Sequence, residues 1–236
     1  MKKTLLALAV AAALVPSLAM AEAGDIVVRL RATSVSPDTS SKLGPQTNAT
    51  GPASATALYG NTGDNATLGV DNNLIAEIDF SYYITKNIAT ELILAAGTRH
   101  DVHINGYDAT NAATHGSNQL GSVNLLPPTL TAQWHFNPDQ TFDPYVGAGL
   151  SYVRAMDNGL ALNGVPIRIS RNSFGPAIQA GFDYNLPDSK WLVNFDVKKI
   201  WFDTKVEVNL NNGGWKKIDQ LDVDPWVVSV GFGRKF

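Results

Sequence analysis

Apolar and polar side chains alternate along several segments of the chain, most clearly in residues 172–185. Phe174, Ile178 and Phe182 belong to an apolar set at the even positions, whereas odd positions such as Ser173 and Gln179 are small or polar. Successive side chains of a β-strand point to opposite faces, so this pattern gives one apolar face and one polar face. We therefore predict a strand over this segment.

The same period of two recurs in seven further segments, which are residues 26–33, 74–83, 88–97, 128–136, 145–152, 191–198 and 226–236. The eight strands are roughly 9–14 residues long, and a tilted strand needs about 9–11 residues to cross the hydrocarbon of a bilayer. Strands of soluble proteins are usually about 5–6 residues long. Inside lipid every backbone polar group must be paired, which requires a closed barrel. The pattern predicts an all-β fold, an eight-stranded antiparallel transmembrane β-barrel.

The connections between these strands alternate in length. Short turns lie at 84–87, 137–140 and 185–190, whereas the connections at about 35–72, 98–124, 155–170 and 203–220 are long. Outer-membrane barrels have short periplasmic turns and long extracellular loops, so the short turns mark the periplasmic side. Aromatic residues collect at both sets of strand ends, as in the girdles of such barrels. They are Tyr82, Trp134, Phe136, Phe142, Tyr184, Trp191 and Phe236 beside the short turns or the C-terminus, and Trp201 and Trp226 at the opposite ends.

The first residues have the form of a secretory signal peptide. Lys2 and Lys3 precede an apolar run from Leu5 to Val15, and small residues two apart close the segment at Ala21. This arrangement predicts cleavage near Glu22, which leaves residues 22–236 as a single barrel domain. The alternative is an anchoring helix, but the apolar run falls well short of the about 20 residues that span a bilayer.

Composition narrows the class of protein further. There are no cysteines, so no disulfide framework is expected, and no later segment reaches the about 18 consecutive apolar residues of a transmembrane helix. The net charge is −3, and near −5 without Lys2 and Lys3, which gives no reason to expect nucleic acid. We expect a protein of the Gram-negative outer membrane, surrounded by outer-membrane lipid and lipopolysaccharide. Periplasmic chaperones and the barrel-assembly machinery are its expected partners during biogenesis.

Several stretches of the chain resemble the OmpW family of small outer-membrane proteins, which includes the alkane-uptake protein AlkL. They are residues 87–92, residues 126–136 with their double proline, residues 144–152, the segment Asp224-Pro225-Trp226, and residues 231–236. The resemblance covers nearly all of the mature chain, in order. It implies an eight-stranded barrel with a narrow, partly apolar lumen and the passage of small hydrophobic compounds. The chain departs from the family pattern in its long first loop and at residues 97–100.

The inward positions of the periplasmic half are mostly polar or charged. An eight-stranded barrel is about wide enough for side chains to fill it, and unpaired charges in a confined interior are costly. We therefore predict a salt-bridged polar plug rather than an open pore; the alternative to a functional role is a network that only holds the barrel shut. The predicted plug comprises Arg29, Arg31, Asp79, Glu91, Gln133, His135, Gln179, Asp196 and Lys198.

The inward positions of the outer half are apolar by the same parity. They predict a cup above the plug that binds a small apolar molecule, whereas the alternative is ordinary packing beneath the loops. The predicted ligand-binding residues are Ile75, Leu125, Ile200, Phe202, Val223 and Val227.

Two consecutive prolines, Pro127 and Pro128, start the fourth predicted strand beside the third. Neither has an N–H group to donate to a neighbouring strand. We expect the seam between these strands to be locally unpaired near the outer membrane face, so that an apolar molecule leaves sideways into the bilayer. The alternative is a plain strand start.

Signs of other chemistry are weak. His100 and His103, with Asp101, lie in a predicted outer loop and make a poor metal signature, so no metal or cofactor is predicted. No nucleophile-elbow or Walker motif occurs. Because some outer-membrane barrels modify lipid, we also consider a site built from Ser151, His135 and Asp183, although we predict that the protein is not an enzyme.

Three hypotheses follow, in order of preference. The first is a passive transport protein for small hydrophobic molecules with lateral release. The second is a structural or surface-interaction barrel whose long loops act as an adhesin or receptor without transport. The third is a lipid-modifying enzyme.

Overall fold

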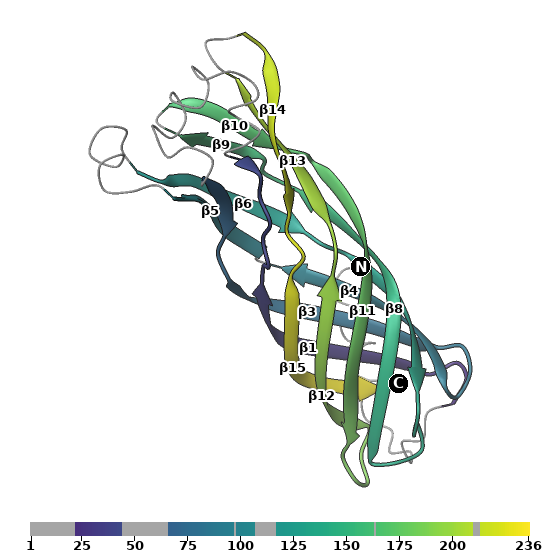
Figure 1. Ribbon diagram of the computed structural model, residues 1–236. Helices are drawn as coiled ribbons and strands as arrows, with labels where there is room; N and C mark the ends of the chain where they lie inside the picture. Colours follow the sequence, from purple (N-terminus) through teal and green to yellow (C-terminus); the bar gives the residue numbers. More distant parts are fainter. Residues whose placement is uncertain (1–21, 44–65, 97, 107–116, 163, 210–212) are drawn as a thin grey trace, which may run out of the picture.

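The computed structural model describes residues 22–43, 66–96, 98–106, 117–162, 164–209 and 213–236, so the predicted signal peptide and much of the first long connection lie outside it. The prediction of an eight-stranded antiparallel barrel is confirmed (Figure 1). The strands pair in chain order, and the last pairs with the first, which closes the barrel. They are β1 (Ile26–Ser36), β3 (Asn73–Tyr83), β4 (Ile88–Ala96), β7 (Thr129–His135), β8 (Phe142–Ala155), β11 (Asn172–Asn185), β12 (Trp191–Ile200) and β15 (Trp226–Lys235).

The register places apolar residues on the outside of the barrel and polar residues inside. Leu30 pairs with Ile78 on one neighbour and Phe232 on the other, and all three point outward. Directly opposed residues of a sheet share a face, so the alternation in each strand sums to a continuous apolar belt. Leu30 is 63% exposed, Leu150 67% and Phe232 64%, which only a lipid environment makes favourable. Within the described residues, no helix has the length and apolar character needed to cross a membrane.

Two inward-facing glycines, Gly149 and Gly231, let neighbouring strands approach closely. A Cβ atom on Gly149 would lie 2.0 Å from the Leu130 carbonyl oxygen, and one on Gly231 would lie 2.1 Å from the Leu30 carbonyl oxygen. Backbone contacts of this kind cannot move aside as a flexible side chain does. Glycine is therefore required at these two positions, and its absence of a side chain leaves room for the charged residues of the lumen.

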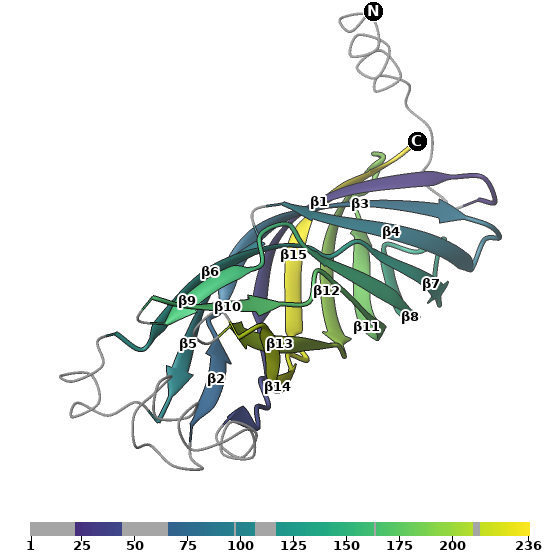
Figure 2. The same ribbon diagram turned by 90° about the horizontal axis from the view of Figure 1, so that it is seen from above.

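The described parts of the four long connections contain strands that the sequence analysis did not identify. They contain seven further strands: β2 (Thr67–Val70), β5 (Thr98–Asn105), β6 (Gln119–Leu126), β9 (Gly159–Leu162), β10 (Val165–Ile169), β13 (Asp203–Asn209) and β14 (Trp215–Asp222). Strands β2, β5 and β6 extend the barrel sheet beyond β8, whereas β14, β13, β10 and β9 form a separate sheet in that order. Figures 1 and 2 show these strands together at one end of the molecule, which we name the extension.

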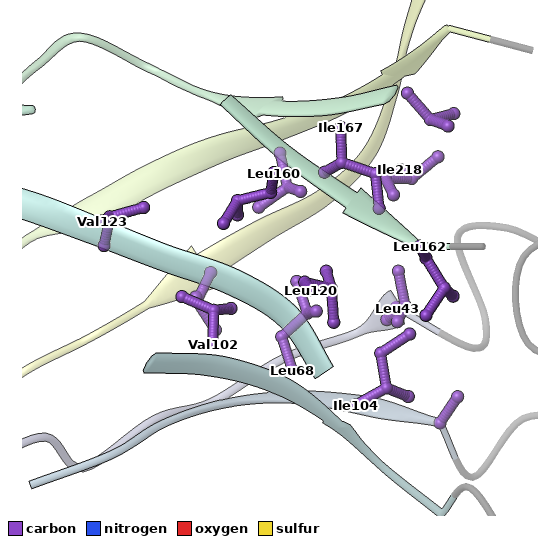
Figure 3. Packing of buried hydrophobic residues seen from close by; sticks show 14 of the residues in the cluster. Leu43, Leu68, Val102, Ile104, Leu120, Val123, Leu160, Leu162, Ile167 and Ile218 are labelled. Atoms are coloured by element: carbon purple, nitrogen blue, oxygen red, sulfur yellow. The ribbon is translucent and has the colours of Figure 1, made fainter. Parts of the chain in front are cut away.

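The extension has an apolar core between its two sheets. Leu68, Val102 and Leu120 come from the first sheet, and Leu160 and Ile167 from the second, and all are at most 6% exposed. Figure 3 shows these side chains between the strands of the two sheets. The bridge between Ser40 and Asp222 ties the segment after β1 to the end of β14. The extension thus prolongs the lumen with an apolar interior.

Candidate functional site

The lumen changes from polar to apolar along each strand toward the extension. The inward residues of β3 are, in order, Ser81, Asp79, Glu77 and Ile75, and all are buried. From Asn194 toward the extension, those of β12 are Asn194, Asp196, Lys198 and Ile200, which are also buried. Residues two apart in a strand lie about 7 Å apart, so both strands change character at a common depth. Glu77 and Lys198 form the last charged layer below the apolar one.

Glu91 lies at the centre of the polar region. Its Oε1 atom accepts hydrogen bonds from Arg29 Nη1 at 3.2 Å and Arg31 Nη2 at 3.1 Å. Its Oε2 atom accepts from the Nε2 atoms of Gln133 at 2.7 Å and Gln179 at 2.9 Å. Both carboxylate oxygens are therefore satisfied by donors from three strands, β1, β7 and β11, which offsets much of the cost of burying this charge.

The two arginines connect Glu91 to the other acids. Arg29 binds Asp183 through two hydrogen bonds, of 3.2 Å from Nε and 2.5 Å from Nη2. Arg31 lies 3.1 Å from Glu77 Oε1 and 2.9 Å from Asp79 Oδ2. The five side chains are at most 4% exposed, so the ion pairs are shielded from water and each charge depends on its partners.

His135 occupies the end of the lumen nearest the short turns. Its Nδ1 atom lies 2.7 Å from Asp143 Oδ2, and its Nε2 atom lies 3.2 Å from Gln133 Oε1. The hydroxyl group of Tyr83 also contacts the imidazole at 3.2 Å. Through Gln133, the histidine belongs to the same network as Glu91. The network therefore extends from the periplasmic strand ends to the apolar layer.

All nine residues predicted for the plug lie in this network, and each is at most 4% exposed. The sequence interpretation left out Glu77, although its alternation parity marked it as inward. It also left out Asp143 and Tyr145 as members. Tyr145 donates to Asp196 at 2.9 Å, and Asp143 precedes the predicted start of its strand, which in fact begins at Phe142. Parity alone identifies inward residues but not their bonding partners.

A pocket with about 670 Å³ of space between atoms lies directly above the network. Most of its lining is apolar, and Glu77 and Lys198 stand on its polar side. Its lining includes all six residues predicted to bind the ligand, Ile75, Leu125, Ile200, Phe202, Val223 and Val227. Further lining residues, Val70, Thr98 and His100, come from segments that the sequence interpretation assigned to loops.

A second apolar pocket, with about 580 Å³ of space, lies inside the extension. Leu125, Phe202 and Val223 line both pockets, so the two spaces adjoin. Leu68, Leu120 and Leu160 line the second pocket from the two sheets of the extension. Sequence reasoning missed it because its walls are the short strands taken for loops.

The ladder between β4 and β7 is interrupted beside the first pocket. Within the described residues, β4 pairs with β7 from Ile88 to Ile93, where Ile93 faces Thr129. Pairing of the two chain segments resumes between Thr98 and Leu125. The described stretch 94–96 and residues 126–128, which include Pro127 and Pro128, thus lie outside both ladders. Pro127 lines the pocket, so this seam borders it directly.

The residues considered for a metal site or an enzyme site do not form either one in the structure's described residues. His100 and His103 lie in strand β5, which corrects their assignment to a loop. The Nδ1 atom of His100 lies 3.0 Å from the carbonyl oxygen of Asp71, and the Nδ1 atom of His103 lies 3.3 Å from Asp71 Oδ1. Ser151 Oγ accepts a hydrogen bond from Thr129 Oγ1 at 2.9 Å. It stands six residues along β8 from Tyr145, which pairs with His135. Six residues span about 20 Å, so Ser151 and His135 do not meet.

One trio of metal-ligand residue types does come together within the described residues. Atoms of His135, Asp143 and Asp183 lie within 4.8 Å of one another. Arg29 already binds both oxygens of Asp183, and His135 binds Asp143. The trio is therefore accounted for by the plug network.

Comparison with known proteins agrees with this architecture. The model of the OmpW family matches residues 22–236. Outer membrane protein W of Escherichia coli is 35% identical over 182 residues, covering 75% of this chain and 80% of that protein. Outer membrane protein AlkL of Ectopseudomonas oleovorans is 28% identical, covering 73% and 70%. The crystal structure of the outer membrane protein OprG from Pseudomonas aeruginosa superimposes with a TM-score of 0.72 at 29% identity, covering 93% of this chain and 99% of that one. The chain therefore belongs to the OmpW family of outer-membrane β-barrel proteins.

Proposed function

We propose that this outer-membrane barrel takes up small hydrophobic molecules, binds them in the apolar pocket above the plug, and releases them sideways into the bilayer. The observation that carries the proposal is the placement of the pocket. It lies between an apolar extension on one side and a fully packed polar network on the other. A molecule that enters through the extension meets a charged barrier below, where burying apolar groups against ion pairs is unfavourable.

The interrupted ladder supports a lateral exit. Ladder hydrogen bonds elsewhere in the barrel would have to break for a ligand to pass between strands, and each backbone group left unpaired in lipid is costly. At residues 126–128 the two prolines have no N–H groups to lose. The pocket touches Pro127, and the lipid-facing side of the seam is apolar, with Leu126 39% exposed. The resemblance to a family associated with hydrophobic compounds is consistent with this route.

Uptake measurements with pocket variants test the binding step. In cells that lack their own family members, Ile75→Asp and Val223→Asp place a charge in the pocket, where each native side chain is 7% exposed. We expect uptake of a labelled alkane to fall to the level of cells without the protein, with the amount of folded barrel in the membrane unchanged. Unchanged uptake in both variants would contradict the proposal.

A second set of variants tests the exit. Pro127→Ala with Pro128→Ala restores two N–H groups, so the β4 and β7 segments gain the capacity to pair across the seam. We expect alkane uptake to fall severalfold. Pro144→Ala, in strand β8, is the matched control, because it adds an N–H group to the barrel away from the seam. Equal uptake by the double variant and the wild-type protein would rule out the lateral exit and leave binding in the pocket untouched.

The proposal needs no catalytic residue, metal or cofactor. It places lipopolysaccharide and outer-leaflet lipid around the seam, and it assigns periplasmic chaperones and the barrel-assembly machinery to biogenesis only. If both sets of variants left uptake unchanged, the barrel would be a scaffold, and the search for function would move to surface interactions of the extension.

A further inference from the structure

The floor of the first pocket carries two hydrogen-bonding groups with unused capacity. Lys198 Nζ lies 3.5 Å from Asp196 Oδ1 and 4.0 Å from Glu77 Oε1. Both distances exceed the about 2.7–3.2 Å of an N–H···O hydrogen bond. Within the described part of the chain, Arg31 binds Glu77 through Oε1 at 3.1 Å, and the ion pair with Lys198 is also measured to Oε1. A buried ammonium group and a buried carboxylate thus retain a donor and an acceptor.

Both groups belong to the network and also line the pocket. Glu77 and Lys198 are among the residues that line it, although they are only 4% and 2% exposed. The next inward residues on their strands, Ile75 and Ile200, stand about 7 Å farther out and begin the apolar wall. The pocket is thus mostly apolar, with the charged pair Glu77 and Lys198 at the end beside the network and the polar residues Thr98, His100 and Thr129 elsewhere in its lining.

We propose that this charged pair binds the terminal hydroxyl group of a linear alcohol or a similar neutral amphiphile, whose hydrocarbon chain lies in the apolar pocket. The inference rests on the proposed function and names the substrate class of the same site. A hydroxyl group both donates and accepts, so it can donate to Glu77 and accept from Lys198. A hydroxyl oxygen placed between Lys198 Nζ and Glu77 Oε1, which are 4.0 Å apart, can contact both groups, because Oε1 can accept a second hydrogen bond beside the one from Arg31.

The acidic groups beside the pocket disfavour a ligand with an anionic head group. The ion-pair network formed by Arg29, Arg31 and Lys198 contains five carboxylates, those of Glu77, Asp79, Glu91, Asp183 and Asp196. A further carboxylate placed beside Glu77 would be repelled by it. A plain alkane fits the wall but leaves the ammonium group and the carboxylate covered without new partners, which is costly.

The test compares isomers of nearly equal size on the intact protein in lipid nanodiscs. Binding of 1-octanol, octane and methyl heptyl ether is measured by headspace partitioning relative to empty nanodiscs, and octanoate is measured by titration calorimetry. After the binding of each compound is normalised to its partitioning into empty nanodiscs, we expect 1-octanol to bind about tenfold more tightly than octane. This factor corresponds to one hydrogen bond to a charged group. The ether, an isomer of octanol that accepts but does not donate, should bind more weakly than octanol, which tests the claim without any variant.

The double variant Glu77→Met with Lys198→Met removes both groups and keeps the charge balance of the network. We expect the preference for octanol over octane to disappear while octane binding is retained. Lys199→Met is the matched control; this neighbouring lysine donates to the Asp224 carbonyl at 2.6 Å and does not line the pocket, so the preference should persist. Folding of each variant is checked by its migration in unheated gels.

The outcomes separate this inference from the proposed function. Equal binding of octanol and octane in the wild-type protein, or tighter binding of octanoate than octanol, would overturn the hydroxyl site while hydrophobic binding stands. Binding of no compound above empty nanodiscs would overturn both. A preference for octanol that survives in the double variant would show that other groups recognise the hydroxyl.

Discussion

At the scale of single residues, the charged side chains of the lumen form one network of buried ion pairs and hydrogen bonds around Glu91. Glu91 accepts hydrogen bonds from Arg29, Arg31, Gln133 and Gln179, and a longer one from Ser81. Such a network is weak evidence of added stability, because well-packed apolar side chains can do as well. However, replacing one charged residue of the network should be costly, because its charged partners would remain buried without it.

Arg31 is the member for which this effect should be largest. Arg31→Met leaves Glu77, Asp79 and Glu91 without a cation that lies within 3.1 Å of each. We expect the free energy of unfolding to fall by about 3–5 kcal/mol, the cost of breaking a buried ion pair. Urea unfolding in lipid vesicles, followed by tryptophan fluorescence, measures it.

Lys86→Met provides the control, because the Lys86–Asp139 pair is exposed at the short turns. Its removal should cost about 1 kcal/mol or less. Similar losses for the two variants would mean that the lumen is hydrated enough to screen its charges.

The residue scale is also where prediction from sequence works best. The parity of each strand suffices to place Arg29, Asp79 and Gln133 inside, because one register slip would turn every side chain of a strand to the lipid. What parity cannot supply is the choice of partner. Glu91 is bound by residues of β1, β7 and β11, whose relative heights depend on the stagger of the closed barrel.

At the scale of elements, the extension is the part that sequence patterns do not reveal. Its strands β2 and β9 have four residues each, which is too short for alternation to stand out. Register shifts between Val102 and His103 and between Val206 and Glu207 break the period in two longer strands. A bulge adds one residue and reverses the parity that follows it. The pocket in the extension, which these strands line, was therefore missed with them.

The extension and the barrel should differ in their response to a charge placed in the extension core. Leu162 in β9 is fully buried, and Leu162→Asp places a carboxylate among the apolar side chains of that core. We expect trypsin to cleave at Arg168 in β10 and Lys216 in β14 at least tenfold faster, while the barrel still migrates as folded in unheated gels. The barrel is closed by its own ladders, so it does not depend on this core.

The matched control is Ala161→Asp, since Ala161 is adjacent in β9 but exposed. Trypsin cleavage of this variant should equal that of the wild-type protein. Loss of the folded gel form by Leu162→Asp would show instead that barrel and extension fold as one unit.

At the scale of the whole molecule, the exposed apolar belt and the position of the charges together fix the orientation in the membrane. The polar network fills the half near the short turns, and the apolar pocket lies toward the extension. Aromatic residues beside the short turns, such as Tyr82 and Trp134, are 48% and 47% exposed, as expected at a lipid–water interface. The extension, the pocket and the lipid-facing side of the seam thus provide apolar surroundings one after another.

The depth of each outward residue predicts what a charge there should cost. Val230 lies near the middle of β15, pairs with Ala32 and is 55% exposed, so Val230→Arg places a cation near the centre of the bilayer. We expect the free energy of unfolding in vesicles to fall by about 2–4 kcal/mol, whereas Tyr82→Arg, at a strand end, should cost about 0–1 kcal/mol. Equal costs at the two positions would place the lipid belt elsewhere on the barrel, and with it the height at which the seam at Pro127 opens to lipid.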